Sequence, residues 1–354
     1  MGQNNLLTGV ARFGWWIFLI IAFLLIPAFS NKYAMTLINN TLITALAVIG
    51  LNVIAGYAGV MSLGNAAFMG IGAYSAAILA SQAGIPWWLA LLIGALAAML
   101  IGTLIGIPAL RLRGIYLLMA TLALHMITAF AMNHYETATK RLAGIRFPKP
   151  SVGIFVFDSS DKFYYLFLTL TALVVLFVYN LMRTGMGRSL LALRDNESAA
   201  RAMGVNITFA KLMAFAVSSF IVGLAGGLQG VYLRNVTGEM YGFGVAMDQI
   251  VALFIGGNGL LFGPVFGAAF ISLLPETIDL LAHSIQGVLP IVGQFLSKFR
   301  FEIQLFVYGF CIILVLLRKP TGLAGIFGDI SLFLKKRILN QAASGSIKRS
   351  VEKG

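Results

Sequence analysis

The sequence predicts an all-α, polytopic integral membrane bundle of about eight to ten transmembrane helices. Hydrophobic residues make up 59% of the 354 residues and charged residues only 10%, whereas soluble domains carry about 25% charged residues. The mean hydropathy is +0.92, and apolar runs of helix-spanning length recur along the whole chain. Together these observations exclude a water-soluble globular enzyme.

The apolar runs give the expected helices in chain order. The first run is interpreted as a retained helix rather than a signal peptide, because further runs follow it at once. The expected spans are residues 13–29, 35–55, 59–80, 86–107, 114–132, 163–182, 209–233, 248–274 and 302–317. The predicted domains are a cytoplasmic N-terminus (1–12), a transmembrane domain (13–330) with a cytoplasmic loop at 183–209, and a polar cytoplasmic tail (331–354).

Glycine and proline interrupt the run that begins at residue 248. These residues disfavour a continuous helix through backbone entropy and a missing donor. The interruption predicts a broken helix or re-entrant hairpin formed by Gly256, Gly257, Asn258, Gly259, Gly263 and Pro264. A bilayer tolerates such backbone only against protein or a water-filled cavity. A similar glycine-rich stretch at 56–65 raises the expectation of an internal repeat, as in many transporters.

Orientation follows from helix parity and from the basic residues, 25 Lys and Arg against 12 Asp and Glu. A cytoplasmic N-terminus places Arg111, Arg113 and the 183–211 loop inside, which satisfies the positive-inside rule. The tail is inside only if one late helix is broken. The same scheme puts a second basic set outside, so charge alone orients the chain weakly: Lys140, Arg141, Arg146, Lys149 and Lys162.

The 183–209 loop predicts a short amphipathic helix. Asp195 is the expected N-cap and Gly204 the expected C-terminal stop, which leaves about eight helical residues. Glu197 and Arg201 stand four residues apart, a spacing that supports a short helix through an ion pair.

One face of this helix is small and apolar. Ala199, Ala200 and Met203 share it, and it suits a groove in another protein. Spacing alone favours the alternative, an ordinary loop helix that packs on its own bundle. The residues assigned to the helix are Arg194, Asp195, Glu197, Ala199, Ala200, Arg201, Met203 and Gly204.

Polar side chains inside apolar runs are expensive in a bilayer and usually face the bundle interior or a cavity. Asn65 and Asn258 rank first, because each lies beside a glycine break where a helix terminus could meet a carboxylate or an ammonium. For His125 a hydrogen-bonded core position is favoured, and Asp248 is equally an N-cap or a gate. The substrate-pathway candidates are Asn52, Ser62, Asn65, Tyr74, His125, Gln229 and Asn258; for Asn52, Asn65 and Gln229 helix-to-helix hydrogen bonds are favoured.

These stretches resemble the LivM-type branched-chain amino acid permeases of ABC importers. The run Glu-Ser-Ala-Ala-Arg-Ala-Met-Gly at 197–204 is similar to the Glu-Ala-Ala…Gly loop that docks permease subunits on their ATPases. The other landmarks, in the family's order, lie at 62–74, 111–116, 187–206, 223–227, 256–268 and 320–323. Residues 139–146 depart from the family's glycine-rich outer loop, and 276–300 are longer than usual and are expected to hold an amphipathic outer helix.

The resemblance implies an importer subunit for branched-chain or other hydrophobic amino acids in a bacterial or archaeal inner membrane, working by alternating access. It implies a paralogous LivH-type permease, two cytoplasmic ABC ATPases and an extracytoplasmic solute-binding protein as partners, besides membrane lipid. The sequence has no Gly-x4-Gly-Lys-Ser/Thr phosphate loop. The chain is therefore expected to be no enzyme and to hold no cofactor, with ATP and Mg in the partner subunits.

Other classes of function fit less well. A secondary transporter needs buried acids, and within the runs only Asp248 and Glu302 occur. A channel has no need of a docking helix, and a permease of the same family for urea, a small amide or an acid stays open. No histidine or cysteine spacing fits a metal site, and the basic residues give no nucleic-acid surface. Glu197→Lys is expected to uncouple transport from ATP hydrolysis without preventing assembly.

Overall fold

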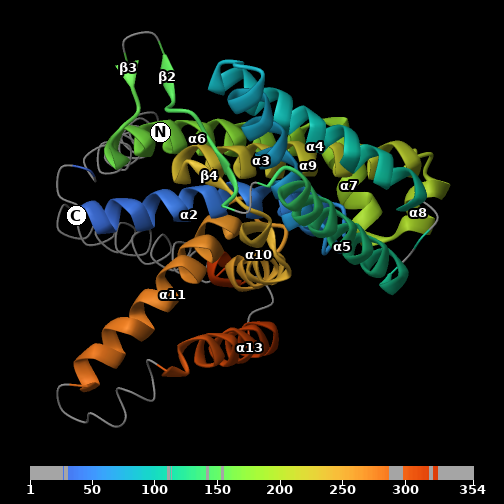
Figure 1. Cartoon of the computed structure of the whole chain (residues 1–354). Coiled ribbons are helices and arrows are strands. Elements are labelled where there is room, and N and C mark those ends of the chain that lie inside the picture. Colours follow the sequence, from blue (N-terminus) through green and yellow to red (C-terminus); the bar gives the residue numbers. More distant parts are fainter. Residues whose placement is uncertain are drawn as a thin grey trace, which may run out of the picture.

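The computed structural model describes residue 27 and residues 31–109, 112, 114–140, 143–152, 155–286, 298–318 and 322–325. Helices dominate this part of the chain, which confirms the predicted all-α membrane bundle (Figure 1). The first expected run lies outside the described residues apart from Pro27, as do Arg111, Arg113 and the 331–354 tail.

The long helices follow the predicted runs closely. They are α2 (Lys32–Leu51), α3 (Asn65–Gln82), α4 (Trp87–Ala109), α5 (Ile115–Ala138), α6 (Ser160–Arg183), α9 (Ile207–Leu233), α10 (Phe243–Gly256), α11 (Gly263–Gln286) and α13 (Arg300–Arg318). Six spans of the described part are long and apolar enough to cross a membrane: Lys32–Tyr57, Trp87–Pro108, Ile115–Ala138, Ser160–Arg183, Ile207–Leu233 and Gly263–Ser284.

Short elements connect these helices. They are the π-helical η1 (Asn52–Tyr57), α7 (Gly185–Asp195), α8 (Glu197–Ala202), the 3-10 segment η2 (Gly238–Tyr241), and strands β1 (Ile145–Arg146), β2 (Ser151–Val152), β3 (Phe155–Val156) and β4 (Asn235–Val236). The strands pair antiparallel as β1 with β4 and β2 with β3. Apolar periodicity did not predict them, because two-residue strands are too short to show it.

Contacts between loops define the two ends of the bundle. At the strand end, β1 after α5 pairs with β4 after α9, and Trp87 Nε1 at the start of α4 donates to the Ser151 carbonyl at 2.9 Å. At the opposite end, which we call the α7 end, Arg194 of α7 donates to the carbonyl of Gly56 in η1. Figure 1 shows β2 and β3 at the upper left, β4 nearer the middle, and α7 and α8 on the right. Successive long helices therefore alternate in direction.

This alternation shows at which end of the bundle the C-terminal helices begin and end. The α10–α11 break returns to the α7 end, and Gly322, beyond α13, lies against Gly257 there, since a Cβ at 322 would stand 2.5 Å from the Gly257 Cα. The broken helix adds the extra crossing that the charge scheme needed. The α7–α8 loop and the described residues 322–325 after α13 consequently lie at the same end of the bundle.

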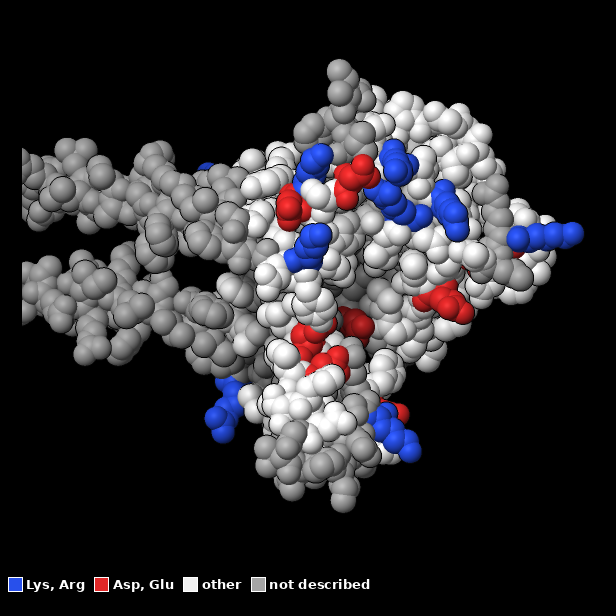
Figure 2. Space-filling view, turned by 60° about the vertical axis from the view of Figure 1, so that its left-hand side comes forward, with Lys and Arg blue, Asp and Glu red and all other residues white. Residues whose placement is uncertain are grey.

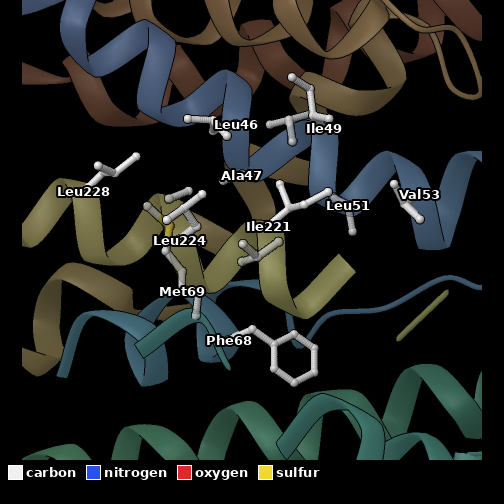
Figure 3. Close-up of a cluster of buried hydrophobic side chains, with 14 of the residues drawn as sticks. Leu46, Ala47, Ile49, Leu51, Val53, Phe68, Met69, Ile221, Leu224 and Leu228 are labelled. Atoms are coloured by element: carbon white, nitrogen blue, oxygen red, sulfur yellow. The ribbon is translucent and has the colours of Figure 1, made fainter. Parts of the chain in front are cut away.

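The core forms where α2, α3 and α9 meet. Figure 3 shows Leu46 and Ile49 of α2 above Ile221 and Leu224 of α9, with Met69 of α3 below. All five side chains are buried. Because lipid tails are as apolar as leucine, van der Waals packing rather than exclusion from water has to stabilise such contacts in a membrane.

Glycines bring the backbones of α3, α4 and α9 into direct contact. A Cβ on Gly72 would lie closer than 3.0 Å to the Gly223 carbonyl oxygen, and one on Gly226 would lie equally close to the Met69 carbonyl oxygen. A Cβ on Gly94 of α4 would likewise stand 2.5 Å from the Gly72 carbonyl oxygen. Small residues at these positions permit the close helix approach that membrane bundles use.

Gly226→Ala is expected to destabilise the bundle by about 1–3 kcal/mol, because the added methyl group collides with backbone that has no rotamer to change. The measurement is thermal unfolding of the purified protein in detergent. The control is Gly309→Ala, at an exposed position of α13 where nothing lies within 4 Å; alanine there stabilises the helix by about 1 kcal/mol at most. Equal transition temperatures for the two variants would contradict the proposed backbone contact.

Both predicted interruptions are present. Helix α10 ends at Gly256 and α11 begins at Gly263, and Gly257 and Gly259 have φ values of 124° and 78°, which glycine adopts at little cost. The first interruption begins later and ends later than the runs predicted: η1 extends to Tyr57, and residues 58–64 lead into α3 at Asn65. Helix, break and helix thus recur at the same end of the bundle. The internal repeat stays a prediction.

Several expected helix limits are wrong. Helix α3 begins at Asn65 rather than at residue 59. Helix α11 continues through Pro275 to Gln286, beyond residue 274. Helix α10 begins at Phe243 and Gly242 is its N-cap, so Asp248 lies within the helix. The apolar residues before Asp248 extend the helix by one turn, which excludes the N-cap role. Residues 287–297, where an outer amphipathic helix was expected, lie outside the described residues.

Candidate functional site at the α7 end

Helices α7 and α8 are joined by a capped turn. Asn196 has extended backbone (φ −162°, ψ 110°), and its Oδ1 accepts from the backbone N–H groups of Ser198 and Ala199, each at 3.0 Å. Asn196 is therefore the N-cap of α8. The prediction of Asp195 is wrong, because that residue completes α7. Helix α8 has 6 residues, fewer than expected.

Gly204 ends this loop helix as predicted. Its φ of 81° is left-handed, and its N–H donates to the Arg201 carbonyl at 3.0 Å. Glycine favours this conformation at helix C-termini because it has no Cβ. The chain then turns into α9, whose N-cap Asn206 accepts from Phe209 N.

The small apolar face of α8 is divided between two surfaces. Ala200 is fully buried against the bundle, whereas Ala199 and Met203 are exposed, Met203 to 72%. The grouping of all three residues on one outward face is therefore wrong for Ala200. Helix α8 packs on its own bundle through Ala200 and presents Ala199 and Met203 outward.

Glu197 has two cationic neighbours. The expected pair with Arg201 is present at 3.6 Å, and Lys211 Nζ, from the first turns of α9, approaches Glu197 Oε2 to 3.0 Å. The Lys211 side chain is only 5% exposed and that of Glu197 22%. A lysine inside the apolar run 207–233 is the sequence signal for this partner. Glu197 therefore fastens α8 to α9 as well as stabilising α8.

One amide side chain bonds η1, the segment before the first break, to the second break. Asn52 of η1 accepts from the Gly259 N–H at 2.9 Å through Oδ1 and donates to the Leu260 carbonyl at 2.9 Å through Nδ2. Asn52 is 1% exposed. The hydrogen bond to another helix that was expected of Asn52 is not present, because both bonds go to the loop between α10 and α11. Irregular backbone at the second break thereby obtains the polar partners that a low-dielectric surrounding demands.

Asn65, at the start of α3, lies in a second buried polar cluster. Its Nδ2 donates to Gln249 Oε1 of α10 and, at 3.4 Å, to the Ala47 carbonyl of α2. Gln249 Nε2 in turn contacts Met69 Sδ at 3.3 Å. The hydrogen bond expected of Asn65 is confirmed, and it joins three helices beside the first break.

Two cavities open near these residues. One of about 160 Å³ lies between the breaks, and its polar lining is Ser62, Arg194 and Asn258 among apolar side chains. The other, of about 430 Å³, is lined by Glu197 and Lys211 together with residues of α5 and the first break. The first cavity brings together two of the predicted pathway residues, Ser62 and Asn258, and Arg194.

The remaining pathway candidates lie elsewhere. His125 is 2% exposed beside Phe243, at 6.1 Å between ring centroids, and its Nδ1 finds no hydrogen-bond partner among the described residues. It is a core residue as expected, but that nitrogen lacks the expected bond. Gln229 Oε1 likewise has no partner in this part of the chain.

Tyr74 belongs to the strand end. Its hydroxyl donates to Glu136, whose Oε1 also accepts from the Gly238 N–H at 2.9 Å. Glu136 is 9% exposed. The predicted run stopped at residue 132 and so left this acid outside; helix α5 extends to Ala138. Glu136 therefore links α3, α5 and η2, and its carboxylate has a structural role.

Charges of both signs share the face that Figure 2 presents, with the left side of Figure 1 turned forward. At the strand end Arg234 donates to Asp158 at 2.7 Å. This hydrogen bond lowers the pKa of Asp158, with smaller effects of Lys149 and Lys162 in the same direction. The ion pair is formed with Arg234, which is not one of the basic residues that the orientation scheme placed outside.

Comparison with known proteins gives one consistent family. A family model described as branched-chain amino acid transport system / permease component matches residues 33–316. The chain is 29% identical over 322 residues to the high-affinity branched-chain amino acid transport system permease protein LivM of Salmonella typhimurium, covering 84% of this chain and 71% of that protein. LivM of Escherichia coli K12 is 29% identical over 321 residues, with the same coverage.

A shorter match reaches the ribose import permease protein RbsC of Haemophilus influenzae, 33% identical over 109 residues, 29% of this chain and 33% of that protein. No solved structure matches the chain.

Proposed function

Since this chain belongs to the permease components of the branched-chain amino acid transport system family, we propose that it is the transmembrane permease subunit of an ATP-binding-cassette importer. Its substrates are branched-chain or other hydrophobic amino acids, and its site is the inner membrane. Sequence similarity to two LivM proteins over 84% of the chain supports the substrate class. The chain is a multi-pass membrane protein with six apolar spans in its described part.

The proposed partners follow from this role. A LivH-type permease completes a heterodimer, two cytoplasmic ATPases bind ATP and Mg, and an extracytoplasmic binding protein delivers the substrate. The observation that carries ATPase docking is the outward pair Ala199 and Met203 on a capped helix at the end of the bundle. This assignment places the α7 end in the cytoplasm and the strand end outside.

In the proposed mechanism, closure of the ATPases moves α8 and its neighbour α7 against the bundle. The movement separates η1 from the second break, which Asn52 holds together in this structure, and opens the pathway inward. The cavity between the breaks supports this route, because it combines an apolar lining with Ser62, Arg194 and Asn258. An amino acid with an apolar side chain requires both kinds of contact.

Co-purification of the complex from native membranes tests the docking assignment. Met203→Glu is expected to weaken retention of the ATPases about 30-fold, the effect of losing one central apolar contact of about 2 kcal/mol. Because Met203 is 72% exposed, neither this change nor the control Met203→Leu disturbs the core. Met203→Leu should keep the ATPases bound. Equal retention by both variants would refute docking through α8, and a wild-type chain without any ATPase would refute the importer.

A further inference from the structure

Arg194 lies where α7 meets both helix breaks. Its Nη1 donates to the Gly56 carbonyl at 2.8 Å, and Gly56 belongs to the segment that leads into the first break. No carboxylate of the described residues forms an ion pair with Arg194, in contrast to Arg201 and Arg234. Backbone of the break, rather than an acidic side chain, therefore binds its guanidinium.

Two glycines provide the room for this side chain. A Cβ on Gly259, in the second break, would lie closer than 3.0 Å to Arg194 Nη1, and one on Gly59, in the first, would lie 3.1 Å from the Arg194 Cα and Cγ. Both glycines have positive φ values, 78° and 69°. The guanidinium thus occupies space between the breaks that any larger residue at 259 would fill.

A second side chain links two of these segments. Asn52 bonds η1 to the second break, and Arg194 bonds α7 to η1 and lies against Gly59 of the first break and Gly259 of the second. Helix α7 continues through the Asn196 cap directly into α8. A displacement of α7 and α8 can consequently reach both breaks through this one side chain, besides the contact of α8 with α9 through Glu197 and Lys211.

On this basis, and on the proposed importer function, we propose that Arg194 is a positioning residue that transmits movement of the α7–α8 unit to both helix breaks. It acts inside the subunit and does not contact the ATPase. An arginine suits this task because its planar fork carries five donors, so it can hold one carbonyl while it contacts a second segment. Lysine offers a point charge with a different reach.

The experiment uses the complete importer, reconstituted in vesicles, with leucine uptake and ATP hydrolysis measured together. Arg194→Gln is expected to keep the ATPases bound and to lower the leucine transported per ATP about tenfold, a typical size for a coupling free energy between sites. Arg194→Lys should recover part of the ratio. The control is Arg188→Gln, on an exposed position of α7 whose guanidinium donates to the Arg183 carbonyl at 3.4 Å and to no other group of the described residues; its ratio should equal that of the wild type.

A distance measurement on this chain distinguishes the inference from the proposed function. Spin labels on Ser198→Cys in α8 and Phe262→Cys at the second break, with Cys311→Ser, report the separation of the two segments. Both label sites are exposed, and Cys311 is the only native cysteine. Arg194→Gln is expected to broaden the distance distribution even in the absence of any ATPase.

An unchanged distribution, or an unchanged transport ratio, would overturn the inference while leaving the importer intact. Loss of bound ATPase in Arg194→Gln would also overturn it, since Arg194 would then be part of the docking surface. A wild-type chain that binds no ATPase but shows the broadening would refute the proposed function and leave the internal link in place.

Discussion

Replacing Asn52 with leucine is expected to destabilise the protein by about 2–4 kcal/mol and to abolish most transport. Leucine has nearly the same shape, but it leaves the Gly259 N–H and the Leu260 carbonyl without their side-chain partner. A buried polar group that loses its hydrogen bond costs about 1–3 kcal/mol. The loss concerns both hydrogen bonds that Asn52 makes to the second break, so the junction between the breaks should loosen.

Thermal unfolding in detergent and amino acid uptake by the reconstituted importer measure the two effects. The matched control is Asn40→Leu, the same exchange in helix α2, which leads directly into η1 and where the described residues give the Asn40 side chain no hydrogen bond. That variant should retain both stability and uptake. If Asn52→Leu also unfolds at the wild-type temperature, the bonds between the breaks contribute nothing to the fold.

Glu197→Lys is expected to destabilise the α8–α9 junction by about 3 kcal/mol, the cost of breaking a largely buried ion pair by removing one partner. The new lysine would face Lys211, whose side chain is 5% exposed and cannot turn to water easily. Loss of transport in this variant would then result from the weakened junction between α8 and α9 within the subunit. The sequence alone led to a different expectation, intact assembly with uncoupled hydrolysis.

A double-mutant cycle checks this explanation. Exchanging the charges in Glu197→Lys with Lys211→Glu should restore most of the stability, because the pair is formed again in the opposite sense. Asp195→Lys, an equal charge change on an exposed neighbour, should leave the unfolding temperature unchanged. A charge-exchanged protein as unstable as the single variant would exclude the pair as the cause.

The sequence predicted the helices well because a bilayer leaves few alternatives. Every backbone polar group in lipid has to be bonded within its own helix, so an apolar run of sufficient length becomes a span. The glycine breaks were predictable for the converse reason. Gly256 and Gly263 bound the interruption in the structure, since these residues weaken a helix at the point where the fold needs it to stop.

The buried face of helix α8 and the residue that caps this helix were harder to predict. Periodicity placed Ala200 beside Ala199 and Met203, but alanine fits a buried or an exposed face equally, and the contact with the bundle decided its place. Between Asp195 and Asn196 both side chains could cap a helix. Backbone geometry, set by the end of α7, selected Asn196. The spacing of residues along the sequence shows neither the burial of Ala200 nor the choice of Asn196 as the N-cap.

Long-range contacts explain the rest. Arg194 was assigned to the docking helix by proximity in sequence, yet its guanidinium meets a carbonyl 138 positions away. The candidate site is assembled from chain segments that only the fold brings together. Their polar side chains in apolar runs indicated Asn258 and Ser62 as substrate-pathway candidates, but did not indicate that they share a cavity with Arg194.

The direct backbone contacts among α3, α4 and α9 limit how this protein can change shape. Helices separated by side chains can slide past one another by switching rotamers, as in shear motions. Where Gly72, Gly223 and Gly226 stand against peptide groups, no rotamers are available, and sliding would drive backbone into backbone. These three helices therefore form one rigid unit, and conformational change is confined to hinges in the loops and breaks around it.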